Sequence, residues 1–168
     1  TFAPQHEPYT PQVLGIAKGF KEAKRRQALV DYDDLLFMAE ELLQAHAEVR
    51  QELGKRWRHL LVDEYQDTNA VQARLVALLA GEHQNVMVVG DDAQSIYAFR
   101  GARLQNILEF PNKFPGTRLV KLERNYRSSQ PILDLTNQII ARARERFDKE
   151  LYTEQGGVEV SGATLGDV

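Results

Sequence analysis

The sequence predicts an α/β fold built around a parallel sheet. Two segments, "RHLLVDEY" (58–65) and "NVMVVGDD" (85–92), contain apolar runs with the length of buried strands, and both runs end in acidic residues. Helical patterns precede, separate and follow these two segments. Strands that alternate with helices form parallel sheets with helices packed on them, and this alternation is the basis of the predicted fold.

The N-terminal third of the chain is predicted to be mostly helical. Three prolines in the first dozen residues indicate an extended start, and a helix is expected from Pro11 to about Leu29. A second helix is expected from about Tyr32 to Leu53, with Gly54 ending it. Apolar residues recur at helical spacing in both segments: Val13, Ile16, Ala17 and Phe20 in the first, and Leu35, Leu36, Met38, Ala39, Leu42 and Leu43 in the second.

A helix is predicted between the two strands, and a shorter one after them. Asn69 and Gln72 have the spacing of a capping box, so the helix "AVQARLVALLA" should begin at residue 70. After the second strand we expect a short helix from about Arg103 to Phe110, followed by the turn "FPNKFPG".

The C-terminal part contains a third strand candidate and one more helix. "TRLVKLERN" (117–125) has a strand pattern. "SSQPILDLTNQIIARARERF" (128–147) is predicted to be a helix, because serines precede it, Pro131 lies near its first turn and its body is amphipathic. From about Thr153 the chain is Gly-rich and weakly patterned, as in a truncated element or a tail.

Length, composition and charge restrict the class of protein to which the chain can belong. The 168 residues are enough for one ordinary domain or parts of two, and 43% hydrophobic with 27% charged residues is typical of soluble proteins. The net charge of -3 gives no global basic field that would attract nucleic acid. Residues 31–67 hold ten acidic and four basic residues, whereas residues 113–149 hold nine basic and four acidic ones. Such an acidic patch facing a basic one suits a metal–phosphate site, although two solvated surfaces would give the same pattern.

The cellular location is predicted from absences in the sequence. The chain has no cysteine, which excludes disulfides and thiolate metal sites and fits a reducing cytoplasm. No apolar stretch approaches the ~18 residues of a membrane span, and the N-terminus has no signal pattern, so no membrane partner is expected. The first residue is not Met, as in a processed chain or a piece of a longer one.

Acidic residues at the strand ends are the main candidates for a site. Ligands of open parallel sheets bind at the carboxyl ends of the strands, where Asp63-Glu64 and Asp91-Asp92 are expected. Four clustered carboxylates repel one another unless a cation is present, and Mg²⁺ fits best because it takes oxygen ligands. Acidic residues after strands also serve as turn formers and helix N-caps, so each pair by itself is ambiguous.

Four segments in order carry a specific resemblance: "DYDDLL" (31–36), "LLVDEYQDTNAVQ" (60–72), "VMVVGDDAQSIYAFRGA" (86–102) and "LERNYRSSQPIL" (122–133). Over roughly residues 10–155 the chain resembles the UvrD/Rep-like superfamily 1 DNA helicases. "DEYQD" resembles helicase motif II (Walker B), "GDDAQSIYAFRGA" motif III and "NYRS" motif IV. The resemblance implies a motor that hydrolyses Mg-ATP between two RecA-like domains and moves 3′ to 5′ on single-stranded DNA, acting at duplex junctions.

The resemblance also implies roles in the ATP site. Asp63 would hold Mg²⁺ and Glu64 would be the general base toward the attacking water, in a reaction that relies on positioning and charge neutralisation. Gln94 matches the γ-phosphate sensor, whose neutral amide can bond phosphate or water. Arg127 matches the arginine that reaches the γ-phosphate with a bidentate fork. Tyr126 matches the aromatic that stacks on adenine.

Two further aromatics match the DNA-contacting residues of motif III. Tyr97 and Phe99 would stack on bases, which gives sequence-tolerant binding, and many family members have Trp where this chain has Phe99. Without the motif, two aromatics at this spacing would be interpreted as core residues. Tyr126 and Arg127 alone would be a strand end and a solvated charge.

The motifs also predict the domain organisation. A P-loop, G-x-x-x-x-G-K-[ST], is absent from the sequence, and the family has it upstream of these motifs, with motifs V and VI downstream. We therefore expect an internal fragment of a helicase, inactive alone, whose partners are the missing N-terminal P-loop segment and the missing C-terminal motor segment. Residues 1–55 would end an inserted helical subdomain, 56–112 would belong to the first RecA-like domain, and 113–168 would start the second. The acidic and basic stretches would then face each other across the ATP cleft.

Two other function classes remain open from the residues. One is a nuclease that holds two metal ions with Asp63, Glu64 and Asp91. The other is a non-catalytic DNA-binding or regulatory module that kept the helicase surface and lost the P-loop.

Overall fold

The centre of the fold is a pair of parallel strands, β1 (Leu60–Val62) and β2 (Val86–Val88), with Leu61 opposite Met87 in register. The 11-residue helix α4 (Ala70–Ala80) connects them. The predicted α/β class, with two parallel strands separated by a helix, is therefore confirmed. That the sheet is RecA-like, and that the first helices are an inserted subdomain, stay predictions.

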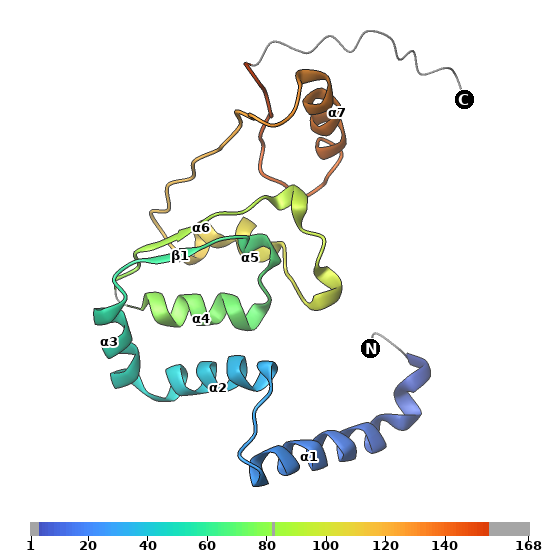
Figure 1. Cartoon of the computed structure of the whole chain (residues 1–168), viewed down its shortest axis with the longest axis vertical. Coiled ribbons are helices and arrows are strands. Elements are labelled where there is room, and N and C mark those ends of the chain that lie inside the picture. The colour runs from blue at the N-terminus through green and yellow to red at the C-terminus, as the bar shows by residue number, and fades with distance from the viewer. Residues whose placement is uncertain (1–3, 82, 155–168) are drawn as a thin grey trace.

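The structure is a computed structural model that describes residues 4–81 and 83–154. In the view of Figure 1, α4 lies below the sheet, between the sheet and α2. The remaining helices are α1 (Thr10–Arg26), α2 (Tyr32–Ala45), α3 (Ala47–Arg56), α5 (Gln105–Leu108), α6 (Phe110–Lys113) and α7 (Gln130–Ile140). Four short 3₁₀ turns complete the described elements: η1 (Pro4–Tyr9), η2 (Tyr65–Asp67), η3 (Asp92–Gln94) and η4 (Ala98–Arg100).

Helix α4 begins where its sequence predicts. The Asn69 side chain accepts the Gln72 N–H at 2.9 Å, and the Gln72 side chain accepts the Asn69 N–H at 2.9 Å. This reciprocal capping box satisfies two of the amides that every helix N-terminus leaves free. Further along α4, Arg74 forms an ion pair with Glu40 of α2. The hydrogen bonds from Arg74 lower the pKa of Glu40.

The predicted second helix is in fact two helices. Its pattern predicts continuity to Leu53, but His46 has extended backbone angles (φ -117°, ψ 92°) and separates α2 from α3. Arg50 stabilises the break, because its guanidinium donates to the backbone carbonyls of Leu43 and, at 3.1 Å, of Gln44. Those carbonyls belong to the last turn of α2, where no intrahelical donor remains for them.

Three further sequence predictions are corrected near the ends of the chain. Residues 4–9 form a 3₁₀ turn and not an extended segment. Residues 117–125 form no strand: their only pairing within the described chain is an isolated parallel bridge between Arg124 and Tyr152. Helix α7 ends at Ile140, earlier than predicted, and Arg146 donates to the carbonyls of Ala141 and Ala143 just beyond it. The predicted tail lies outside the described residues from 155 onward.

The core lies on one face of the sheet only. Tyr65, Ala73, Ile107 and Phe110 form its buried centre, and the Tyr65 and Phe110 rings meet edge to face at 5.6 Å. The other face of the sheet is open, since Leu61 is 73% exposed. The sequence predicts buried strands, but only one face of each strand is covered, because the described helices lie on one side of the sheet.

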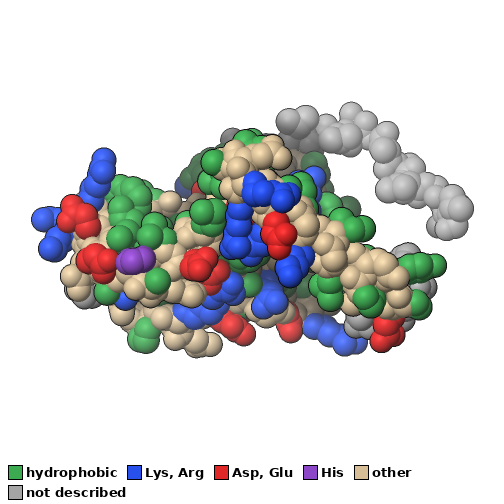
Figure 2. Space-filling model, turned by 90° about the horizontal axis from the view of Figure 1, so that it is seen from below, with side chains coloured by type: hydrophobic (Ala, Val, Ile, Leu, Met, Phe, Trp, Pro, Cys, Tyr) green, Lys and Arg blue, Asp and Glu red, His purple; other side chains and the backbone are tan. Residues whose placement is uncertain are grey.

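Helix α1 contributes nothing to this core. None of its residues is buried, and its apolar side chains are exposed, including Ile16 and Phe20. The space-filling view shows hydrophobic side chains at the surface beside Lys and Arg side chains (Figure 2). Lys24, near the end of α1, pairs with Asp31 at 2.7 Å and with Asp34, which joins α1 to the start of α2. No described helix is long and apolar enough to cross a membrane.

Candidate functional site

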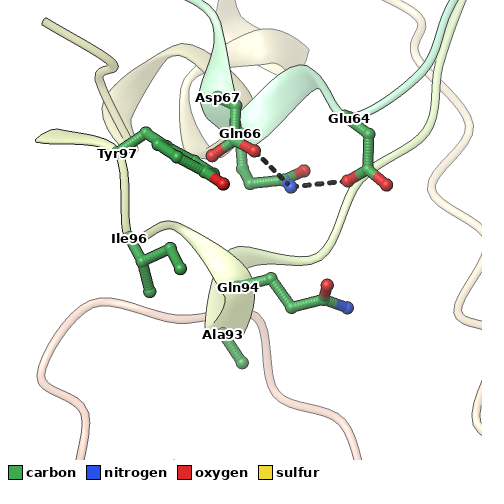
Figure 3. Close-up of a pocket in the computed structure, with 7 residues that line it drawn as sticks. All are labelled: Glu64, Gln66, Asp67, Ala93, Gln94, Ile96 and Tyr97. Atoms are coloured by element: carbon green, nitrogen blue, oxygen red, sulfur yellow. Dashed lines mark hydrogen bonds between the residues drawn. The ribbon is translucent and has the colours of Figure 1, made fainter. Parts of the chain in front are cut away.

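A pocket of about 530 Å³ opens next to the carboxyl ends of β1 and β2 (Figure 3). Its walls come from η2, which follows the first strand, and from the loop with η3, which follows the second. Seven residues line it: Glu64, Gln66, Asp67, Ala93, Gln94, Ile96 and Tyr97. The sequence predicted a site at this edge of the sheet, and the structure brings three of the predicted site residues, Glu64, Gln94 and Tyr97, around one cavity.

The chain leaves β1 through a strained residue. Glu64 has left-handed backbone angles (φ 50°, ψ 41°), which are uncommon for residues other than glycine and cost about 1–3 kcal/mol. Its N–H is bonded to the Asp63 carboxylate at 2.9 Å, and the next amide, of Tyr65, donates to the Val89 carbonyl at 3.0 Å. This conformation turns the chain at the strand end and leaves the Asp63 and Glu64 carboxylates exposed.

Gln66 connects the two strand ends. Its side chain is 1% exposed, its Nε2 donates to Glu64 Oε2 at 2.8 Å, and its Oε1 accepts the Asp91 N–H at 3.0 Å. Figure 3 shows the first of these bonds crossing the wall of the pocket. A buried amide with both ends bonded has one orientation, so Gln66 holds the Glu64 carboxylate relative to the β2 loop.

Gly90 makes the close approach of Gln66 possible. A Cβ built on Gly90 would lie 2.5 Å from Gln66 Oε1 and 2.7 Å from Ile107 Cδ1, far inside normal contact distance. Any larger residue would push the Gln66 amide away from the backbone it bonds. The glycine of "GDD" therefore has a packing reason independent of turn formation.

The cation that faces Asp91 and Asp92 is a lysine. Lys149 Nζ lies 2.6 Å from Asp92 Oδ1 and also bonds Asp91 Oδ1, and Asp92 Oδ2 accepts the Phe147 N–H at 3.0 Å. Burial raises the pKa of Asp91, but the hydrogen bonds from Lys149 and Gln94 outweigh it and lower the pKa overall. Burial lowers the pKa of Lys149, but its two aspartates outweigh it and raise the pKa overall.

The expected cluster of four carboxylates is therefore wrong. Among residues 4–81 and 83–154, no group of three or more acidic or histidine side chains is placed to hold a metal ion. The nuclease hypothesis needs Asp63, Glu64 and Asp91 at one site, and the described part of the chain offers no such site. Asp91 is instead bonded by Lys149 and, at 2.8 Å, by Gln94 Nε2.

The two carboxylates that follow β1 remain suited to a Mg²⁺ ion that has other ligands. Asp63 and Glu64 are exposed at the strand end, and Mg²⁺ usually takes one or two carboxylates together with water and phosphate oxygens. Asp67, in the wall of the pocket, has a buried carboxylate oxygen, Oδ1, for which the described residues supply no hydrogen-bond partner. Such an orphaned acceptor fits a site that a hydrated cation or a water completes.

The two aromatic side chains that follow Gln94, Tyr97 and Phe99, are not buried in the core. Phe99 is 77% exposed and Tyr97 is 38% exposed, so the alternative of simple core packing is wrong for Phe99. The two rings lie 5.9 Å apart, and the Arg100 guanidinium lies 5.4 Å from each ring centroid. An exposed cluster of two rings and a cation has the composition of a stacking platform for nucleic acid.

Tyr126 and Arg127 do not line the pocket. Tyr126 is 66% exposed and Arg127 is exposed, in the bend before α7. Asn125 shapes this bend by accepting the N–H groups of Arg127 and Ser128, both at 2.8 Å. The Arg124 guanidinium lies 5.0 Å from the Tyr126 ring.

The loops that follow the two strands are bonded into one unit. Asn106 of α5 is 4% exposed, and its Nδ2 donates to the Thr68 carbonyl at 2.9 Å. The Arg103 N–H donates to the same carbonyl at 3.0 Å, and Asn69 forms an antiparallel bridge with Ala102. These bonds connect the segment after β1 to the end of the loop that carries the aromatics.

The residues that sequence reasoning missed are those that hold others in place. Gln66, inside "DEYQD", has polar neighbours in the sequence, yet its side chain is buried and bonded at both ends. Neither the packing role of Gly90 nor the ion pairs of Lys149 had a recognisable sequence signal. Lys149 is 57 residues from Asp92, and such a contact cannot be read from local spacing.

Comparison with known proteins identifies the family of the chain. The family model described as the UvrD/REP helicase N-terminal domain matches residues 2–115. DNA helicase II of Salmonella typhimurium is 44% identical over 139 residues, 83% of this chain and 19% of that protein. The ATP-dependent DNA helicase Rep of Escherichia coli is 48% identical over 128 residues, 76% of this chain and 19% of that protein.

The ATP-dependent DNA helicase PcrA of Leuconostoc citreum is 47% identical over 135 residues, 80% of this chain and 18% of that protein. The chain thus spans about a fifth of the length of the curated relatives it matches. The family match covers both strands, the pocket and the exposed aromatics. The chain belongs to the UvrD/REP helicase family.

Proposed function

We propose that the chain is part of an ATP-dependent 3′–5′ DNA helicase, which couples hydrolysis of Mg-ATP to movement along single-stranded DNA. The observation that carries the proposal is the single pocket that joins Glu64, Gln94 and Tyr97 at the carboxyl ends of two parallel strands. Ligand sites of open parallel sheets lie at this edge. The relatives named as ATP-dependent DNA helicases support the same activity.

In this proposal Asp63 and Glu64, which follow β1, take part directly in ATP hydrolysis. A Mg²⁺ ion bound with ATP would neutralise charge on the phosphates, and Asp63 would hold it through its exposed carboxylate. Glu64 would accept the proton of the attacking water, and the bond from Gln66 at 2.8 Å would keep one carboxylate oxygen oriented while the other remains available. The strained backbone of Glu64 supports a functional demand at this position.

Gln94, in the loop after β2, would contact the γ-phosphate or the attacking water. Gln94 is exposed in the pocket, and its Nε2 is bonded to Asp91, which leaves the amide oxygen free to accept from a water molecule. Arg127 would contact the γ-phosphate and Tyr126 would stack on the adenine, both from the far side of the nucleotide. The exposure of these two side chains is compatible with contacts made only when nucleotide is bound.

Tyr97 and Phe99 would form the DNA contact. They follow Gln94 by three and five residues, so one loop would link the nucleotide to the bases. Residues 1–55, 56–112 and 113–168 would belong to an inserted helical subdomain, the first motor domain and the second motor domain. The P-loop would come from a segment outside this sequence, and the 168-residue chain alone would hydrolyse no ATP above background.

Two substitutions in the full-length helicase test the proposal. Phe99→Ala should weaken binding of labelled oligothymidine by about 1–3 kcal/mol, the value of one base stack, and leave ATP affinity unchanged. Gln94→Ala should leave DNA affinity unchanged and lower the stimulation of ATPase by DNA. A fluorescence titration and a steady-state ATPase assay measure these quantities. Equal effects of both substitutions on both quantities would contradict the proposal, and a non-catalytic module would show no ATPase to lose.

A further inference from the structure

Lys149 ties the segment after α7 to the loop after β2. In Figure 1 the chain leaves α7 and returns to the loop that contains η3. There the Phe147 N–H donates to Asp92 Oδ2 at 3.0 Å, Lys149 bonds both aspartates, and the Phe147 side chain packs against the core cluster. Three contacts of different kinds therefore fix this segment at one place.

The contact is largely shielded from water. The side chains of Lys149, Asp91 and Asp92 are 14%, 35% and 3% exposed. A cation and two carboxylates at such exposure hold each other firmly, because removal of the cation would leave a buried charge without a partner. The contact is thus specific in a way that an exposed surface pair is not.

Asp91 transmits this contact to the pocket. Lys149 bonds Oδ1 of the carboxylate, and Gln94 Nε2 donates to Oδ2 of the same carboxylate at 2.8 Å. Oδ1 also accepts the Ala93 N–H at 3.1 Å, so the ammonium and this amide together hold Oδ1, and the planar carboxylate then restricts where Oδ2 lies. The Gln94 amide, which is otherwise exposed, takes its orientation from that oxygen.

We propose that Lys149 is a positioning residue, which acts through Asp91 to hold the Gln94 amide in the orientation used for hydrolysis. The inference rests on the proposed role of Gln94 at the γ-phosphate. It adds that this role depends on a residue 55 positions further along, in the segment assigned to the second motor domain. Hydrolysis would then be fastest only when that segment is docked on the first domain.

The test is a double-mutant cycle in the full-length helicase that contains this segment. Lys149→Met should lower kcat of the DNA-stimulated ATPase by about tenfold, the loss expected for one charge-assisted hydrogen bond, with the KM for ATP unchanged. Lys149→Arg keeps a donor and should retain kcat within about threefold of wild type. Lys121→Met, which removes an exposed lysine that lies before α7, is the control and should leave kcat and the KM for ATP unchanged.

The combination of Lys149→Met with Gln94→Ala decides the mechanism. If Lys149 acts through Gln94, the double variant should be no slower than Gln94→Ala alone, because coupled residues are not additive. Losses that multiply would overturn the inference. A normal kcat for Lys149→Met beside a slow Gln94→Ala would also overturn it, and the proposed function would stand. A normal kcat for Gln94→Ala would instead contradict the proposed function itself.

A second variant guards against simple loss of folding. Asp91→Asn replaces one carboxylate oxygen with an NH₂ group, which cannot accept a hydrogen bond from Lys149 or Gln94, and should give the same selective fall in kcat, with an unchanged far-UV circular dichroism spectrum. In the 168-residue chain, ¹⁵N NMR should show the Gln94 side-chain amide resonances moving toward random-coil positions in Lys149→Met and not in Lys121→Met. If these resonances do not move, the proposal that Lys149 positions Gln94 through Asp91 is overturned.

Discussion

Replacing Gly90 by alanine should destabilise the protein through one methyl group. The new Cβ would lie 2.5 Å from Gln66 Oε1 and 2.7 Å from Ile107 Cδ1, and these side chains are only 1% and 7% exposed. Neither can move into solvent. Overpacking of this kind typically costs about 1–3 kcal/mol. If Gln66 gives way, its bonds to the Asp91 N–H and to Glu64 are stretched, at about 1 kcal/mol for a typical net hydrogen bond.

The expected loss for Gly90→Ala is therefore about 2–3 kcal/mol in the free energy of unfolding. For a chain of this size, each kcal/mol lowers Tm by roughly 2–4 °C, so the variant should melt roughly 4–12 °C below wild type. Urea unfolding followed by circular dichroism measures the free energy, and an unchanged m-value shows that the same surface is exposed on unfolding.

Gly19→Ala is the matched control for this substitution. A Cβ at Gly19, in the middle of α1, has no atom within 4 Å, so the same chemical change meets open space. Alanine in a helix interior is favoured over glycine by roughly 0.5–1 kcal/mol, and helix content should rise without a fall in Tm. A Gly90→Ala variant that unfolds at the wild-type urea concentration would refute the tight contact between the two strand ends.

Two further predictions concern the chemistry of the site and its pH dependence. In the full-length helicase, Glu64→Gln should leave ATP binding nearly intact and cut turnover by roughly 10²-fold or more, as expected for loss of a general base; a steady-state ATPase rate within about threefold of wild type would show that Glu64 is not the base. In the 168-residue chain, the Phe147 amide resonance should be constant between about pH 5 and 9, because the pKa of Asp91 is lowered and that of Lys149 is raised. A lowered carboxylate pKa stabilises the docked segment above the unfolded-state value of 3.8, so docking should be lost as the pH falls below that value. Loss of docking near neutral pH would contradict the assigned ion pairs.

The sequence alone was sufficient where the structural signal is local. The capping box of Asn69 and Gln72 lies within four consecutive residues, and α4 begins where it predicts. The two apolar runs form the parallel strands, because each is short, apolar and separated from the other by one helix. The position of the candidate site was predicted from the same pattern, since both strands are followed by acidic side chains at one edge of the sheet.

Local patterns failed where a distant residue decides the outcome. Residues 117–125 have the composition of a strand, yet a strand also needs a neighbour, and in the described chain only Tyr152 is bridged to this segment. The helix predicted from residue 32 breaks at His46, and Arg50 bonds carbonyls at the end of α2 that a continuous helix would have used. The apolar character of β1 did not reveal which face is covered, since Leu61 is apolar and exposed.

The partners of the acidic residues show most clearly what the tertiary structure decided. The sequence by itself determined that Asp63, Glu64, Asp91 and Asp92 follow two parallel strands, because that depends on local order along the chain. It predicted a shared cation for all four, whereas the fold divides them: Asp63 and Glu64 stay exposed, and Asp91 and Asp92 are bonded to Lys149. Electrostatic pairing depends on distance in space, and only the return of the chain after α7 brings that ammonium to the strand end.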